Sequence, residues 1–172
     1  EEKSSFGSSV VPVQTAVPAF VGYTEKANRG SKSLMNKPTK ISSFGQFVEL
    51  FGGAPATKFN LEGDENSPVG FKISFVDSTR YLLYDSMRLF FANGGADCYI
   101  VSVGNYSDKI DASKLNDPSG GGLLTLEKNL EPTILVVPEA VLLSESDCFS
   151  LQAAMLSHCG YKMKNRFAIL DV

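Results

Sequence analysis

Two carboxylates that follow apolar, strand-like runs are the side chains best placed to do chemistry. Glu139 comes just after residues 133–137 (Thr-Ile-Leu-Val-Val), and Asp171 closes residues 166–172 (Arg-Phe-Ala-Ile-Leu-Asp-Val). Parallel α/β sheets gather catalytic groups outside the carboxyl ends of their strands, where two carboxylates could bind Mg²⁺ or act as general acid and base. We favour the alternative that they cap helices and bond to loops, because no nucleophile, phosphate-binding cations or second histidine accompanies them.

Three glycine clusters invite a nucleotide-binding interpretation, but their positions oppose it. Gly52-Gly53 and Gly94-Gly95 follow predicted helices, where the helix dipole disfavours anions. Gly120-Gly121-Gly122 precedes a predicted helix but lacks the lysine or the spaced third glycine of a phosphate loop. We interpret all three clusters as helix caps or linkers.

His158 is the only histidine, and it adjoins Cys159. Cys148 and Cys159 lie on one predicted helix, about 16 Å apart, which is too far for a shared metal ion. We therefore expect that the protein binds no metal and no cofactor. His158 should be a satisfied or exposed histidine near a helix end. The alternative is that a cysteine and a histidine from different elements form a nucleophile pair. Together with Cys98 the chain has three cysteines, an odd number, and each lies in an apolar part of the sequence. This pattern indicates reduced core thiols in a cytosolic setting.

Composition argues against two classes of partner. The 172 residues carry a net charge of −3, with the charges scattered along the chain. No basic stripe indicates nucleic-acid binding, and no apolar run or leader-like segment indicates direct membrane insertion.

The clearest structural signal is in residues 90–104, which read Phe-Phe-Ala-Asn-Gly-Gly-Ala-Asp-Cys-Tyr-Ile-Val-Ser-Val-Gly. They predict a helix end, a glycine turn and a buried strand. The helix should span residues 81–92 with Asp77 or Ser78 as its cap, since apolar residues recur there with helical spacing. Those residues are Leu83, Met87, Phe90 and Phe91.

The first part of the chain predicts a strand, a loop and a short helix. Residues 13–24 read as a strand, in which Pro18 argues against a central position or for pairing that spares its missing N–H. Residues 26–40 read as a loop. Ser43 and Gln46 indicate a capping box for a helix whose apolar face contains Phe44, Phe47, Val48 and Phe51.

Later segments predict further alternating elements. Residues 60–70 look like an exposed loop and residues 71–75 like a half-buried strand. A short helix should follow near residues 123–130. Ser144 or Ser146 should begin a longer helix, stopped by Gly160, with a buried stripe of Cys148, Leu151, Met155 and Cys159.

This order predicts an α/β fold with a mainly parallel sheet, flanking helices in a three-layer arrangement, and an extended N-terminal arm. Residues 1–12 should form the arm, because they hold four serines and no periodic apolar face. Residues 13–172 should form one core domain with a variable loop or insertion around residues 57–78. Since the chain begins with Glu1 and stops after an apolar run, we expect that the C-terminal part of this domain is missing.

Four segments in this order resemble the tail sheath proteins of contractile phage tails and related injection systems. They are residues 17–27, 90–104, 131–140 and 166–172, and the most specific is the block Phe-Phe-x-Asn-Gly-Gly-x-x-Cys-Tyr-Ile-Val. The resemblance implies a structural subunit without enzymatic activity, which polymerises helically around an inner tube and contracts to drive that tube into a target. It also implies contacts with other copies, the inner tube protein, and baseplate and terminal cap proteins. Assembly would take place in the bacterial cytoplasm, as part of a phage tail or of a phage-tail-like particle released from the cell.

In that family, extended arms add strands to neighbouring subunits, so residues 1–12 become the expected root of such an arm. Scattered charges are candidates for ion pairs exchanged between lattices, although plain solvation is the simpler interpretation. These charges are Lys26, Arg29, Glu62, Asp64 and Asp108. The residues expected to contact a neighbour are Glu1, Glu2, Lys3, Ser4, Ser5, Phe6, Val10 and Val11.

Two other functions stay open at this stage. One is a hydrolytic or ligand-binding α/β enzyme that uses Glu139 and Asp171 at the strand ends. The other is a carbohydrate- or receptor-binding module that depends on the exposed loop at residues 60–70.

Overall fold

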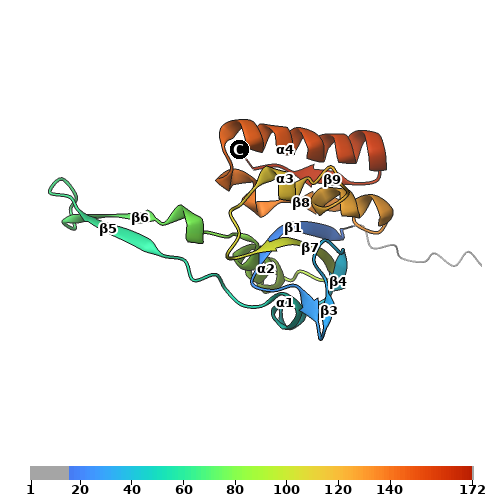
Figure 1. Ribbon diagram of the computed structural model, residues 1–172, viewed down its shortest axis with the longest axis horizontal. Helices are drawn as coiled ribbons and strands as arrows, with labels where there is room; N and C mark the ends of the chain where they lie inside the picture. The colour runs from blue at the N-terminus through green and yellow to red at the C-terminus, as the bar shows by residue number, and fades with distance from the viewer. Residues whose placement is uncertain (1–15, 172) are drawn as a thin grey trace, which may run out of the picture.

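The computed structural model describes residues 16–171, and the expected arm at residues 1–12 lies outside this range. A five-stranded sheet in the order β4-β7-β1-β8-β9 runs through the centre of the body (Figure 1). Strands β7, β1, β8 and β9 are parallel and β4 is antiparallel, which confirms the predicted α/β class and mainly parallel sheet. The strands are β1 Pro18–Thr24, β4 Thr39–Ile41, β7 Cys98–Asn105, β8 Ile134–Val136 and β9 Phe167–Ile169.

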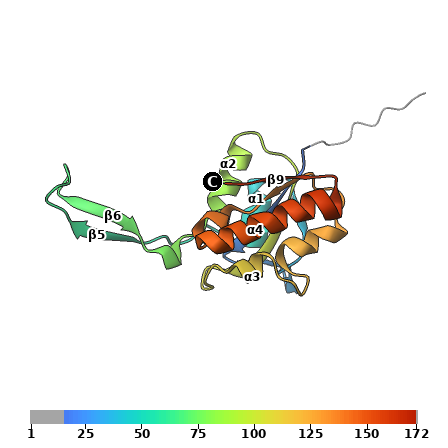
Figure 2. The same ribbon diagram turned by 90° about the horizontal axis from the view of Figure 1, so that it is seen from above.

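Helices lie on both faces of this sheet (Figures 1 and 2). On one face are α1 (Phe44–Phe51) and α2 (Leu83–Ala92); on the other are α3 (Ala112–Leu115) and α4 (Glu145–Ser157). Shorter helical turns are η1 Asp77–Thr79, η2 Gly122–Lys128, η3 Pro138–Leu142 and the π-helical η4 His158–Met163. Two hairpins complete the fold: β2 Asn28–Arg29 with β3 Lys32–Ser33, and β5 Phe59–Gly63 with β6 Phe71–Phe75.

Strand β1 is central, and all seven of its residues are buried. Successive side chains of a strand point to opposite faces, so Val21 and Tyr23 join the core beneath α4 while Phe20 joins the core around α1 and α2. Pro18 is the first residue of the strand, a position where a missing N–H is tolerated. The expectation that proline keeps this strand from the centre was therefore wrong, and the alternative, pairing that spares the N–H, fits its place.

Helix α1 begins as its sequence predicts, with a small difference. The Gln46 N–H donates to Ser43 Oγ at 3.2 Å, but Gln46 Oε1 accepts from the N–H of Ser42 rather than of Ser43. Val48 is 37% exposed and Leu50 is buried in its place, so the predicted buried face was wrong at this position.

Four expectations for other segments are corrected by the structure. Residues 26–40 contain β2, β3 and the start of β4 rather than a plain loop, and residues 59–75 form an exposed hairpin rather than a loop and a half-buried strand. The apolar run at residues 166–172 predicts a third buried strand, but β9 lies at the edge of the sheet and Phe167 is 80% exposed. Gly160 does not end the helical path, which continues through η4 to Lys164 at φ +58°.

Replacement of Phe47 by alanine tests the core around α1. The ring is 1% exposed and stacks with Phe51, so F47A should lower the free energy of unfolding by about 3–5 kcal/mol. V48A removes an apolar group one residue away that is already partly in water. This variant should change the free energy of unfolding by less than about 1 kcal/mol. Urea denaturation followed by circular dichroism measures both; equal losses would contradict the assigned orientation of α1.

Candidate functional site

Glu139 lies in η3, just beyond β8, and its side chain is fully buried. Its Oε1 accepts hydrogen bonds from the N–H groups of Leu83 at 3.0 Å and Leu82 at 3.3 Å. These N–H groups begin α2, whose own N-cap residue, Leu82, offers no side-chain acceptor. The first N–H groups of a helix need partners and carry partial positive charge, so Glu139 caps α2 from a distant part of the chain.

The predicted caps of this helix lie elsewhere. Asp77 and Ser78 belong to η1, before α2 begins. Nothing in the local sequence of α2 points to Glu139, because the two meet only through the sheet. The sequence favours a capping role for Glu139 in general, but it does not identify Glu139 as the cap of α2.

Gly22 of β1 makes room for the carboxylate. A Cβ atom at this position would lie 2.3 Å from Glu139 Oε2, which is closer than real contacts allow. Oε2 is buried and has no hydrogen-bond partner among residues 16–171. Burial raises the pKa of Glu139 to about 7, while the N–H groups of Leu83 and Leu82 act in the opposite direction.

Asp171 is placed apart from this carboxylate. It lines a groove of about 520 Å³ together with residues of α2, α4 and the ends of β8 and β9. Glu139 is not among the residues that line this groove, and the Asp171 backbone carbonyl accepts from Gln152 Nε2 at 2.6 Å. The structure therefore does not bring the two predicted carboxylates into one cavity.

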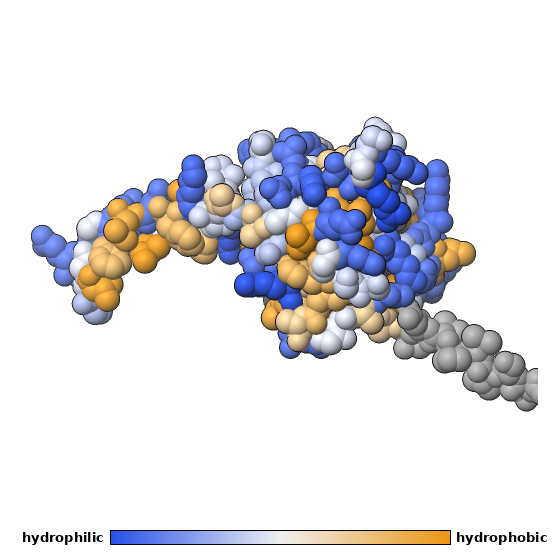
Figure 3. All heavy atoms as spheres, turned by 90° about the horizontal axis from the view of Figure 1, so that it is seen from below, coloured by the Kyte–Doolittle hydropathy of each residue, from blue (hydrophilic) through white to orange (hydrophobic). Residues whose placement is uncertain are grey.

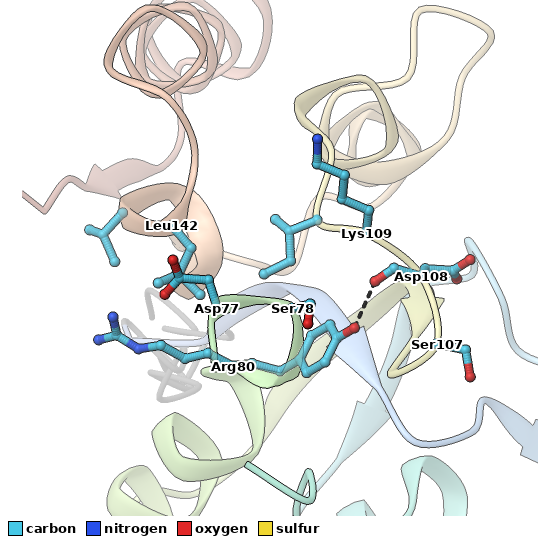
Figure 4. A pocket seen from close by; sticks show the side chains of 10 residues that line it. Asp77, Ser78, Arg80, Ser107, Asp108, Lys109 and Leu142 are labelled. Carbon is cyan, nitrogen blue, oxygen red and sulfur yellow. Dashed lines mark hydrogen bonds between the residues drawn. The ribbon is translucent and has the colours of Figure 1, made fainter. Parts of the chain in front are cut away.

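A second groove, of about 630 Å³, opens near the carboxyl ends of the strands (Figure 4). Its lining combines charges of both signs from Asp77, Arg80 and Lys109 with the apolar Leu142. Tyr81 Oη donates to the carbonyl of Asp108 at 2.7 Å, the bond drawn in Figure 4. Its lining residues include no histidine or cysteine, so the groove itself offers polar contacts rather than a nucleophile with a neighbouring base.

Asp108 is the one predicted exchange charge that forms an ion pair among the described residues, with Lys114 at 3.1 Å. The N–H of Asn105 and the Lys114 ammonium lower the pKa of its carboxyl. Within residues 16–171, the other candidates form no ion pair; they are Lys26, Arg29, Glu62 and Asp64.

His158 and Arg166 form a buried pair on the α4 side of the sheet. Arg166 is 4% exposed and donates to the carbonyls of Leu126 at 3.2 Å and Asn129 at 2.6 Å, with His158 Nε2 3.3 Å from its Nη1. Burial and the Arg166 charge lower the pKa of His158 to about 4, so a neutral imidazole faces the guanidinium at neutral pH. The sequence predicts a satisfied or exposed histidine, but His158 is buried and only partly satisfied, since its Nδ1 has no partner among the described residues.

The cysteines are all free, with Cys98 and Cys159 buried and Cys148 half-buried. Burial raises the pKa of Cys98 to about 12 and raises that of Cys159, which keeps both as thiols. In residues 16–171, no group of three or more histidine, cysteine, aspartate and glutamate side chains could hold a metal ion. The glycine clusters act at helix ends, as Gly52 at φ +92° and Gly94 at φ +86° illustrate.

The hairpin β5–β6 is the feature that sequence reasoning missed. Phe59 pairs with Phe75 and Leu61 with Ile73, which places these apolar side chains on one face of the hairpin. Figure 3 shows this band of apolar side chains on the projecting hairpin. Matching alternation in residues 59–63 and 71–75 was the available signal.

Comparison with known proteins returns neither a matching family model nor a matching curated protein. Over residues 16–171, the helices are too short or too polar for any of them to cross a lipid bilayer.

The Glu139 cap predicts a specific dependence of stability on pH. Because its pKa is raised from 4.5 to about 7 in the folded state, the contribution of Glu139 to stability should be fully present below about pH 4.5 and should be lost as the pH rises through 7. Relative to E139Q, which cannot ionise, the wild-type free energy of unfolding should fall by roughly 3 kcal/mol between about pH 4 and pH 8. Chemical denaturation of both proteins across this range measures the difference, and parallel pH profiles would refute it.

Proposed function

We propose that this chain is a structural subunit of a contractile tail sheath, which polymerises helically around an inner tube and contracts to drive it into a target. The observation that carries the proposal is where the four sheath-like segments lie. Residues 17–27 contain β1, residues 90–104 contain all of β7 except Asn105, residues 131–140 contain β8, and residues 166–172 contain β9. These strands are adjacent and parallel, so the resemblance corresponds to one continuous part of the sheet.

The proposed architecture is a three-layer body with an extended N-terminal arm that adds a strand to a neighbouring subunit. Such an arm gains main-chain hydrogen bonds and keeps subunits linked while they slide. The body suits this task, since two hydrophobic cores flank one sheet and resist deformation. The arm would pull on β1, which is the first strand after it in the sequence and lies at the centre of the sheet.

Contraction in this proposal is a change between two packings of the same rigid bodies. The partners are other copies, the inner tube protein, and baseplate and terminal cap proteins, in a particle assembled in the bacterial cytoplasm. Lys26 and Arg29 project in the segment around β2 without an ion pair among the described residues, so they are free to exchange partners between lattices.

The proposed role involves no enzymatic activity. Glu139 supports this view, since its carboxylate is fully buried and bonded to the start of α2. The enzyme alternative predicts loss of turnover in D171N, whereas the sheath proposal predicts that D171N assembles normally.

Removal of residues 1–12 tests the arm. The truncated protein should keep the far-ultraviolet circular dichroism and thermal midpoint of the parent, because the cores lie within residues 16–171. It should form no tubes in negative-stain electron microscopy when expressed with the inner tube protein, whereas the parent should form long striated tubes.

A matched pair of variants controls for nonspecific effects of the truncation. V10D with V11D places charge on the apolar part of the arm and should also prevent tubes, while S4D with S5D adds the same charge at polar positions and should weaken assembly less. Tubes formed by the truncated protein would refute the arm. Uniform small particles from the parent under all assembly conditions would refute the sheath proposal itself.

A further inference from the structure

The hairpin β5–β6 presents an apolar surface that its own body does not cover. One of its faces contains Phe59, Leu61 and Ile73, which are 59%, 67% and 58% exposed, with Phe71 and Phe75 beside them. Both ribbon views show the hairpin projecting away from the body (Figures 1 and 2). An isolated two-stranded hairpin is marginally stable in water, so a surface that covers this face would also stabilise the hairpin.

Helix α4 presents a second apolar surface on the outside of the body. Its inner stripe, including Leu151 and Met155, is buried against the sheet. Phe149, Ala153 and Leu156 follow helical spacing on the opposite side, with Phe149 62% and Leu156 54% exposed. Residues 148–161 contain no charged residue, although α4 lies along the top of the body in Figure 1. A helix that is apolar on both sides is typical of one buried on both sides.

We propose that the apolar face of the β5–β6 hairpin of one copy packs across the outer face of α4 in a second copy. Within one chain the hairpin points away from the body that carries α4, so the two surfaces cannot meet without a second molecule. The inference rests on the proposed function, and it names the surfaces that join one sheath subunit to another.

Charge complementarity fixes the direction of this contact. Lys58 and Arg80 lie at the root of the hairpin together with one acidic residue, Asp77, while Asp64 and Glu65 lie at its tip. Helix α4 has the opposite arrangement, with Glu145 and Asp147 at its start and Lys162 and Lys164 after its end; Lys162 also pairs with Glu127 of its own chain. The root should therefore lie over the start of α4 and the tip near η4.

The lengths of the two surfaces agree with this direction. The hairpin from residue 58 to 64 spans about 20 Å at the rise of a β-strand. The helical path from residue 147 to 162 spans about 22 Å. Both pairs of charged ends can therefore meet at once.

The size of the contact favours a repeated interaction over an isolated dimer. The exposed apolar side chains of the hairpin offer on the order of 500 Å², below the roughly 800 Å² per partner of a stable interface. Because the contact joins two different surfaces, it leaves one of each unused and can repeat along an open helical assembly.

Photo-crosslinking of the full chain tests the contact. Benzoylphenylalanine at Leu61 should yield chain-to-chain adducts whose mass spectra map to the α4 peptide containing Phe149 and Leu156. The same probe at Asn60, on the opposite face of the hairpin, should yield at least fivefold fewer such adducts. Adducts from Leu61 that map to another hairpin, to the inner tube protein or to a different surface of the body would overturn the proposal.

Charge exchange tests the direction. K58E should raise the concentration needed for assembly about fivefold, and E145K in the same chain should restore it. K72E, on the polar face of the hairpin, is the control and should have little effect. No rescue by E145K would overturn the assigned direction. Tubes that form while Leu61 adducts map elsewhere refute only this contact, whereas absence of any polymer from the parent refutes the sheath function.

Discussion

The burial of β1 on both faces is the constraint on which the rest of the structure depends. A strand in the middle of a parallel sheet needs neighbours on both edges and apolar cover on both faces. Here β7 and β8 pair with its edges, and two separate cores pack against its alternating side chains. Helices α1 and α2 and the elements around α4 are thereby fixed relative to one strand. Force applied to the chain ahead of Pro18 would reach both cores at once.

Two buried ionisable side chains of opposite kind, the carboxyl group of Glu139 and the guanidinium of Arg166, link the helical layers to this sheet. Glu139 accepts from the N–H groups that begin α2, and Arg166 donates to carbonyls at and beyond the end of η2. Glu139 satisfies N–H groups that the first turn of α2 leaves unpaired, and Arg166 places positive charge at the carbonyl end of η2, both in the sense expected from the helix dipole. These bonds offset part of the desolvation cost of each charge, and the part that remains for Glu139 raises the pKa of its carboxyl. These groups hold elements together rather than forming a reaction centre.

The exterior contrasts with this closed interior. Two clusters of apolar residues are buried inside the body, yet the hairpin and α4 both present further apolar surface to solvent. Their opposite charge orders are what the proposed contact between copies uses. In the proposed lattice, small contacts of this kind would be exchanged when subunits repack, while the body itself would carry the force. The proposed mechanical function thus divides between a stiff centre and weakly bound surfaces.

The sequence by itself determined the class of the fold and the sheath resemblance. A continuous apolar run identified the strand at Cys98, and helical spacing identified the helix through Leu83 and Met87, because both patterns depend on neighbours only a few residues apart. Tertiary structure alone decided the central place of β1, the edge position of β9 and the capping of α2 by Glu139. Each depends on which elements become neighbours, and Glu139 and Leu83 are separated by 56 residues. Local spacing cannot encode a contact between segments that only the sheet brings together.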